Sequence, residues 1–259
     1  MSTLMSEAER AAAWQELQDF ARALQELDAP QIRAAFVIGS FPGGYFRPGQ
    51  SDLDVVIILA GSPPEDELTC QEHQTLRQAI KRIASTASPY EIEPLFIYET
   101  ELKRDPNSGL LPRADFALRL LSQSQLLMGE FDLHQVDQPL PQDFKVVLQR
   151  YLEYFQHRIN PDGIDQATLP ALVKHVLTLM RYALIICRQH VQYNKLAVLQ
   201  DYLRLIPEIP LPHSLQKVIE KSLLGEPIDP DLAAAFRHEL PAFQQALVDA
   251  MFQAKPESH

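Results

Sequence analysis

GSFPGGYFRPGQSDLDVVII, residues 39–58, contains a glycine-rich turn and then two aspartates that lead into an apolar run. The preceding residues 33–38 (RAAFVI) are typical of a short buried strand. Residues 51–60 (SDLDVVIILA) are typical of a central strand, because their apolar run is nearly continuous. Asp52 and Asp54 are two positions apart, so they project from the same face of that strand. Burying two unpaired carboxylates is costly, and a bound cation would offset the cost.

The turn and the aspartates together indicate phosphate chemistry. Gly39-Ser40 ends a strand at a tight turn, where backbone N–H groups and a hydroxyl can approach a phosphate oxygen. Asp52 and Asp54 can share divalent cations, as phosphoryl transfer requires. Mg²⁺ is the expected ion, because it prefers carboxylate ligands and substrate phosphates. Ser51 offers a second hydroxyl for phosphate, although an ordinary turn serine gives the same pattern.

A third carboxylate is expected from residues 90–98 (YEIEPLFIY), which are typical of a strand. Glu91 and Glu93 point to the same face of it. We favour Glu93 because an apolar run follows it, and Glu91 remains the alternative. The chosen glutamate either completes the metal site or acts as general base on the acceptor hydroxyl. Pro94 is a caution for this strand prediction, because proline cannot donate to the ladder.

The stretch from Gly39 to Ile58 resembles the signature of the polymerase-β-like nucleotidyltransferase superfamily. More narrowly, it is similar to the adenylyltransferases that modify streptomycin and spectinomycin. Those enzymes carry in the same order the features found here as Gly43-Gly44, Arg47-Pro48 and Ser51 to Asp54. The resemblance implies an ATP-dependent or other NTP-dependent enzyme that uses Mg²⁺ and transfers AMP to a hydroxyl group.

The resemblance extends to residues 175–203 (HVLTLMRYALIICRQHVQYNKLAVLQDYL). In the family, an Arg and a Lys in this segment hold the nucleotide triphosphate, and these positions fall on Arg181 and Lys195. Residues 99–114 contain no tryptophan, whereas the family has one near there that packs on streptomycin. Ala171 stands where the family has an acidic residue.

The rest of the chain indicates an α/β domain followed by a helical one. Helices are predicted over residues 6–27, 65–84 and 113–124, and a short strand over 125–129, giving a mixed sheet of about four strands with flanking helices. After Pro139 the pattern is helical, with breaks at 160–163, 206–212 and 225–230 and about five helices, which suits a bundle. We therefore predict a nucleotidyltransferase catalytic domain over 1–140 and a helical bundle domain over 141–259.

The net charge of the chain bears on which molecule could accept the nucleotide. The net charge is −11, and residues 1–140 hold 11 Lys and Arg against 21 Asp and Glu. Such a surface repels a polyanion, so we expect that the acceptor is not a nucleic acid. We predict a small hydroxyl-bearing molecule, with aminoglycosides among the candidates, bound near Glu93 and lined by Glu91, Asp115 and Asp165. The alternative is an antitoxin-like or regulatory protein of this fold that binds or nucleotidylates a protein partner.

Two further features bear on location and redox chemistry. No uninterrupted apolar run is long enough to span a bilayer, and residues 1–10 lack a signal pattern, so we expect a cytoplasmic protein with no membrane contact. Cys70 and Cys187 form no Cys-x-x-Cys pair, which argues against a zinc site or a disulfide framework.

Overall fold

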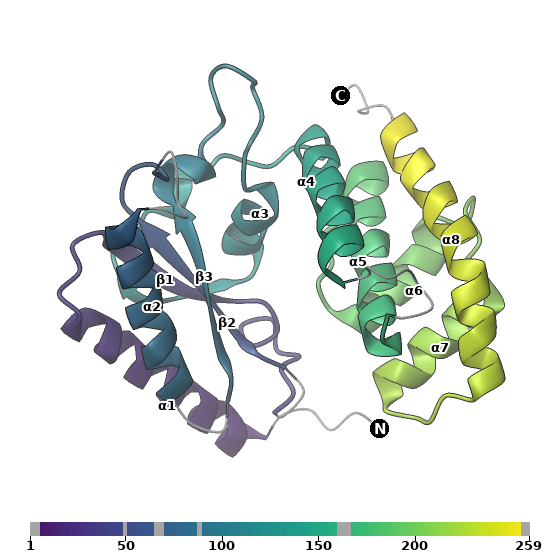
Figure 1. Cartoon of the computed structure of the whole chain (residues 1–259), viewed down its shortest axis with the longest axis horizontal. Coiled ribbons are helices and arrows are strands. Elements are labelled where there is room, and N and C mark those ends of the chain that lie inside the picture. Colours follow the sequence, from purple (N-terminus) through teal and green to yellow (C-terminus); the bar gives the residue numbers. More distant parts are fainter. Residues whose placement is uncertain (1–5, 49–50, 65–69, 87–89, 160–166, 255–259) are drawn as a thin grey trace. The chain divides into compact units, whose positions relative to one another are not determined.

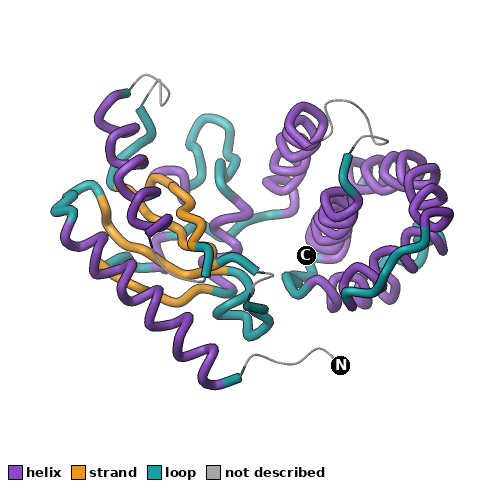
Figure 2. The backbone as a smooth tube through the Cα atoms, turned by 60° about the horizontal axis from the view of Figure 1, so that its bottom comes forward, coloured by secondary structure: helices purple, strands orange, loops and turns teal. Residues whose placement is uncertain are grey.

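The computed structural model describes residues 6–48, 51–64, 70–86, 90–159 and 167–254. The chain divides into two compact units, Met1–Pro139 and Leu140–His259, and each is described by itself. The strands belong to the first unit, and the regular elements described in the second are all helical (Figure 2).

The first unit is a mixed four-stranded sheet with flanking helices, as predicted. The sheet has the order β3-β2-β1-β4, in which β2 and β3 are parallel and the other pairs antiparallel. Figure 1 shows α1 and α2 on one side of the sheet and α3 on the other. The elements are α1 (Glu7–Glu26), β1 (Ile32–Ile38), β2 (Leu53–Leu59), α2 (Gln71–Thr86), β3 (Ile92–Tyr98), the 3-10 helix η1 (Glu99–Leu102), α3 (Ala114–Ser122), β4 (Ser124–Gly129) and the 3-10 helix η2 (Leu133–Gln135).

Strand β2 is apolar throughout because both of its faces are covered. Leu53, Val55 and Ile57 pack in one core cluster with residues of α1 and α2. Val56 and Ile58 alternate with them, point to the opposite face, and are fully buried as well. The aspartates are therefore placed at the start of a strand that has no solvent-facing side further along.

Strand β3 lies at one edge of the sheet, which explains how it accommodates Pro94. Its only neighbour in the sheet order is β2, and Pro94 is aligned with Val55. A proline is tolerated at an edge because the ladder loses no central hydrogen bond there.

The second unit is the predicted helical domain. It consists of α4 (Pro141–Tyr154), a π-helical turn (Phe155–Ile159), α5 (Leu169–Arg188), α6 (Lys195–Leu205), α7 (His213–Leu224) and α8 (Pro230–Gln253). The predicted breaks at 206–212 and 225–230 separate α6 from α7 and α7 from α8. The predicted break at 160–163 lies outside the described residues, as do the first residues, 65–69, of the helix predicted over 65–84.

A break that the sequence analysis missed separates α5 from α6. Gln189 ends α5 in the left-handed conformation (φ 49°), and its N–H donates to the carbonyl of Ile185 (3.1 Å). Asn194 then caps α6 by accepting from the N–H groups of Leu196 and Ala197. No glycine or proline marks this turn, so the usual sequence signals are missing.

Helix α5 is the core helix of the second unit. Among the described residues it is the one helix whose length and composition would allow it to cross a membrane, with a mean hydropathy of 1.5. However, 67% of that window is buried inside the protein. Lys174, His175 and Arg181 interrupt its apolar sequence. A helix buried on most sides in a bundle has this composition for that reason.

A buried histidine joins three helices of this unit. His175 of α5 is 1% exposed, and its Nδ1 lies 2.9 Å from the hydroxyl of Tyr151. Its Nε2 lies 3.0 Å from Oε1 of Gln244, which can only accept, so Nε2 donates and the tyrosine hydroxyl donates to Nδ1. Burial lowers the pKa of His175 to about 4. The ring is therefore neutral at neutral pH.

Candidate active site

Two of the predicted carboxylates stand side by side on the parallel strands. Asp54 of β2 is aligned with Glu93 of β3, and the N–H of Leu53 donates to the carbonyl of Glu91 (2.8 Å). Aligned residues of neighbouring strands project from the same face. Asp54 is half-buried and Glu93 is exposed. Asp52 lies just before the strand and is exposed, so only Asp54 of the pair lies within β2.

The glycine that ends β1 lies against the Asp54 carboxylate. Gly39 has a φ of +78°, a region that side chains other than glycine seldom adopt. A Cβ atom at position 39 would lie 2.8 Å from Oδ2 of Asp54, closer than two such atoms approach. Glycine is therefore required here for two independent reasons. The candidate phosphate turn and the candidate metal ligand are in direct contact.

The turn that begins at Gly39 is closed by its own backbone. The N–H of Gly43 donates to the carbonyl of Gly39 (3.2 Å), and that of Tyr45 donates to the carbonyl of Ser40 (3.0 Å). Phe41 and Phe46 anchor the turn in the core, each 2% exposed and with their rings in edge contact. The backbone of this segment is thus ordered by local bonds and two aromatic anchors.

Tyr45 ties the turn to another part of the sheet, and sequence reasoning missed this contact. Its hydroxyl donates to Oε1 of Gln123 (3.0 Å), which precedes β4. The ring of Tyr45 also occupies the space where a side chain at Gly43 would begin. No short-range pattern links Tyr45 to Gln123, so nothing in the sequence marked either residue.

The two predicted phosphate serines have local roles in turns. The Oγ of Ser51 accepts from the N–H of Arg47 (3.3 Å), and the N–H of Ser51 donates to the carbonyl of Arg47 (2.9 Å). Ser40 is half-buried and supplies the carbonyl bonded by Tyr45. These bonds fix the backbone and do not test whether either hydroxyl contacts a phosphate, so that role stays a prediction.

The structure brings the predicted metal ligands together only in part. In the part of the chain that is described, no three His, Cys, Asp or Glu side chains are grouped so that they could hold a metal ion. The backbone nevertheless aligns Asp54 with Glu93, and Asp52 is two residues away. A donor set made of carboxylate oxygens alone is suited to Mg²⁺ by its chemistry.

The segment between β3 and α3 is closed by polar contacts of its own. Glu101 accepts from the N–H of Tyr98 (2.9 Å) and pairs with Nε of Arg113 (2.8 Å). The guanidinium group of Arg104 donates to the carbonyls of Gly109 and Gln138. This segment, where the family resemblance would lead one to expect an aromatic contact for the acceptor, is a compact polar loop.

The three acidic residues predicted to line the acceptor site differ in their surroundings. Asp115, on the first turn of α3, pairs with Arg119 one turn later (3.4 Å), so its charge is already partly balanced. Glu91 directly precedes β3, two residues before Glu93, and it is exposed. Asp165 lies outside the described residues.

Of the predicted triphosphate ligands, Arg181 lies inside α5 and Lys195 directly follows the connection between α5 and α6. The guanidinium carbon of Arg181 is 5.2 Å from the ring centre of Tyr182 and 5.3 Å from that of Tyr193. Lys195 is exposed and is the first residue of α6. Tyr193 therefore contacts Arg181 and lies two residues before Lys195 in the chain. The approach of the two cations to Asp54, in the other unit, stays a prediction.

Comparison with known proteins finds a family match inside the first unit and a similar fold for most of the chain. Residues 17–106 match the family described as "Nucleotidyltransferase domain". The fold is similar to that of the spectinomycin adenyltransferase AAD(9) from Enterococcus faecialis, crystallised with ATP and spectinomycin, with a TM-score of 0.61 and 16% identity. That match covers 93% of this chain and 99% of the other. Among curated proteins, no sequence matches significantly. The predicted resemblance to nucleotidyltransferases is thus confirmed.

Proposed function

Because this chain carries a nucleotidyltransferase domain, we propose that it is a Mg²⁺-dependent enzyme that transfers AMP from ATP to a hydroxyl group of a small molecule. Pyrophosphate is the second product. The observation that carries the proposal is the alignment of Asp54 with Glu93, together with the contact between Gly39 and the Asp54 carboxylate. A phosphate turn next to two carboxylates is the arrangement that nucleotidyl transfer needs.

The proposed reaction forms one bond and breaks another at the α-phosphorus of ATP. The hydroxyl oxygen of the acceptor attacks that phosphorus, and the bond to the bridging oxygen of pyrophosphate breaks. The proton of the hydroxyl passes to Glu93, which is exposed on the same strand face as Asp54. Glu91 is the alternative acceptor of that proton.

Asp52 and Asp54 would hold the Mg²⁺, and Glu93 would complete the metal site in the alternative in which Glu91 takes the proton. When bound, the metal would supply positive charge that offsets the negative charge of the phosphate oxygens. The carboxylate donor set and the strand alignment support this assignment. Gly39 and Ser40 would contact phosphate oxygens through the turn described above, and the turn's local bonds would keep its N–H groups in place.

Arg181 and Lys195 would bind the triphosphate from the second unit. Two cations of the second unit, one inside α5 and one at the start of α6, can neutralise the charge of the departing pyrophosphate. Tyr193 lies two residues before Lys195, and its ring contacts Arg181. This contact supports a joint role of the two cations in binding the triphosphate.

The acceptor is proposed to be a small hydroxyl-bearing molecule, with aminoglycosides among the candidates. The acidic first half of the chain would attract a polycation. The neighbour of similar fold was crystallised with spectinomycin. The loop between β3 and α3 lacks the tryptophan that packs on streptomycin in the family that this sequence resembles. Tight streptomycin binding is therefore not expected.

The test is pyrophosphate release with each NTP in the presence of Mg²⁺, across a panel of hydroxyl-bearing molecules that includes spectinomycin and streptomycin. Mass spectrometry then identifies the modified acceptor. An added AMP on any of them supports the proposal. No turnover with any NTP and acceptor, together with a stoichiometric protein partner recovered from cells, would instead favour a regulatory protein of this fold.

A further inference from the structure

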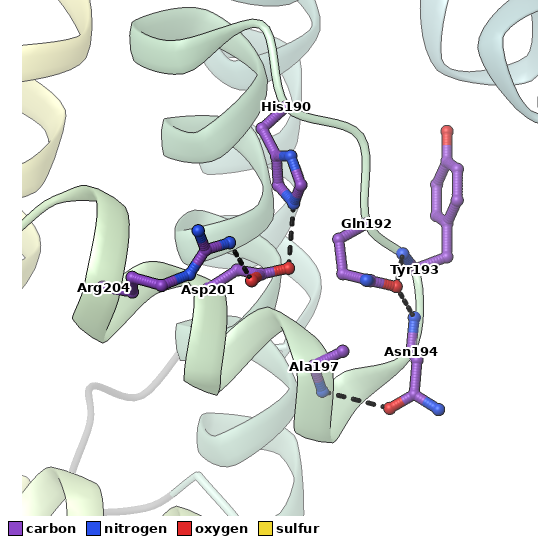
Figure 3. A network of polar contacts seen from close by, with 7 residues as sticks. All are labelled: His190, Gln192, Tyr193, Asn194, Ala197, Asp201 and Arg204. Atoms are coloured by element: carbon purple, nitrogen blue, oxygen red, sulfur yellow. Dashed lines mark hydrogen bonds and ion pairs between the residues drawn. The ribbon is translucent and has the colours of Figure 1, made fainter.

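The connection between α5 and α6 is held by side chains that the proposed chemistry has not used. His190 reaches from this loop to Asp201 on α6, with 2.8 Å between Nε2 and Oδ2 (Figure 3). Hydrogen bonds from Arg204 and then His190 lower the pKa of Asp201. The carboxylate is therefore ionised at neutral pH and can only accept, so Nε2 of His190 carries the hydrogen and donates.

Gln192 holds the other half of the loop. Its Oε1 accepts from the N–H groups of Tyr193 and Asn194, both at 3.0 Å. Asn194 in turn accepts from the N–H groups of Leu196 and Ala197, which begins α6. Figure 3 shows His190 and Gln192 on the side of the loop that faces α6 and the ring of Tyr193 pointing away from it. We call His190, Gln192 and Asp201 the loop clasp.

Tyr193 and Lys195 lie close to the clasp residue Gln192 in the chain. Tyr193 is 8% exposed, and its ring faces the guanidinium group of Arg181 at 5.3 Å. Lys195 follows two residues later as the first residue of α6. A loop without glycine or proline between two helices would otherwise sample many conformations, and ordering it at the moment of binding would weaken affinity.

We propose that the loop clasp pre-orders the α5–α6 connection, so that His190, Gln192 and Asp201 are positioning residues for the triphosphate that Arg181 and Lys195 bind. This inference rests on the proposed function. It assigns to three residues a role in nucleotide affinity although none of them contacts the nucleotide in the proposal. Supporting residues of this kind hold a binding constellation in its productive geometry.

The chain offers a matched control. Arg204 pairs with the same carboxylate, with 2.7 Å between its guanidinium nitrogen and Oδ1 of Asp201, but it lies on α6 itself and its side chain is 65% exposed. Removing Arg204 takes one partner from Asp201 and leaves the bond from the loop residue His190 to Asp201 in place. His190→Ala and Arg204→Ala thus differ in whether the loop is released.

The experiment measures ATP affinity by calorimetry in Mg²⁺ and the KM and kcat for ATP, with the thermal midpoint recorded for each variant. We expect His190→Ala and Gln192→Leu to raise Kd and KM by about tenfold, the cost of ordering a few side chains, with little change in kcat or Tm. Arg204→Ala should stay within about twofold of the wild type. Asp201→Asn keeps an acceptor oxygen for His190 and should bind ATP nearly as well as the wild type, whereas Asp201→Ala should not.

Two results would overturn the inference while wild-type turnover stands. One is wild-type ATP affinity in His190→Ala. The other is an equal loss in His190→Ala and Arg204→Ala, which would assign the effect to the stability of α6. A wild-type protein that neither binds ATP nor releases pyrophosphate would overturn the proposed function, and the inference with it, before any variant is compared.

Discussion

At Asp54, three parts of the chain that are distant in sequence meet. Gly39 contacts its carboxylate from the end of β1, and Glu93 is aligned with it from β3. This residue therefore carries both the candidate metal site and the packing of the phosphate turn. Substitution of Asp54 tests the metal site, and substitution of Gly39 tests the packing of the turn. The two effects can therefore be measured separately.

Asp54→Asn should abolish pyrophosphate release and leave the fold intact. The amide keeps the shape of the side chain but removes a metal ligand, and with it transition-state stabilisation worth several kcal/mol. Asp52→Asn should behave in the same way. Asp19→Asn, which removes an exposed carboxylate paired with Arg22 in α1, is the charge-matched control and should keep full activity. Near-normal turnover in either site variant would show that the metal assignment is wrong.

Gly39→Ala should destabilise the protein more than Gly44→Ala. Both glycines have nearly the same positive φ, +78° and +77°, so the strain of about 1 kcal/mol for a left-handed alanine is common to both. Only Gly39 has the Asp54 carboxylate where the new Cβ would be, and nothing lies within 4 Å at Gly44. The measurement is urea unfolding of both variants followed by fluorescence of Trp14. Equal losses would contradict the contact between Gly39 and Asp54.

The sequence could predict the residues of the site that share a short motif, and few of the others. Asp52 and Asp54 are recognisable because carboxylates seldom lead into a buried strand. Glu93 could be proposed because a neighbouring strand must face them. The bond between Tyr45 and Gln123 could not be predicted, because it depends on a turn and a strand end that meet only in the folded sheet.

Among the elements, β2 was the easiest to predict and the α5–α6 connection the hardest. The apolar run of β2 reflects burial on both faces, which a sequence records directly. The connection begins at Gln189, a residue with no preference for the left-handed conformation that it adopts. Its turn is stabilised by the side chains of His190 and Gln192, which a reading of helix periodicity treats as ordinary polar residues.

Gln189→Gly should stabilise the second unit. Glycine relieves the cost of the left-handed conformation at the end of α5, a position where it is the most common residue, with a gain of up to about 1 kcal/mol. Gln189→Ala is the control, since alanine retains that cost and should give no gain. The free energy of unfolding, measured by far-ultraviolet circular dichroism, distinguishes them. Destabilisation by glycine would show that the side chain of Gln189 matters more than its backbone.

For the whole molecule, stability should depend on pH differently in the two units. His175 is buried and neutral in the second unit, with a pKa of about 4, against an ordinary value of 6.5. Between these values the unfolded chain binds a proton that the folded chain does not, so stability falls as the pH drops from 6.5 to about 4. The full effect is about 3 kcal/mol.

The single tryptophan, Trp14, provides the internal comparison, because it lies in α1 of the first unit. Urea unfolding is measured at pH 7 and at pH 5, by far-ultraviolet circular dichroism and by Trp14 fluorescence. The loss of stability at pH 5 should be larger by circular dichroism, because that signal includes the helices of the second unit, than by fluorescence. His175→Gln should reduce that difference by removing the titrating group. A difference that persists in His175→Gln would assign the acid sensitivity to other groups.

For the whole molecule, the fold class was predictable because the sequence pattern changes near Pro139. Both strands and helices are predicted before this residue, and only helices after it. The charge imbalance between the two halves was equally visible. The role of Arg181 and Lys195 stays a prediction, because no local pattern relates them to Asp54.

The edge position of β3 has a consequence for solubility. An unprotected strand edge invites the addition of a strand from another molecule, and charged side chains or proline prevent it. Here Glu91 directly precedes the edge strand, and Glu93 and Pro94 lie within it. The carboxylates proposed for catalysis therefore also protect the sheet from growing into an aggregate. Substitution of both glutamates by neutral residues should therefore favour self-assembly through this strand.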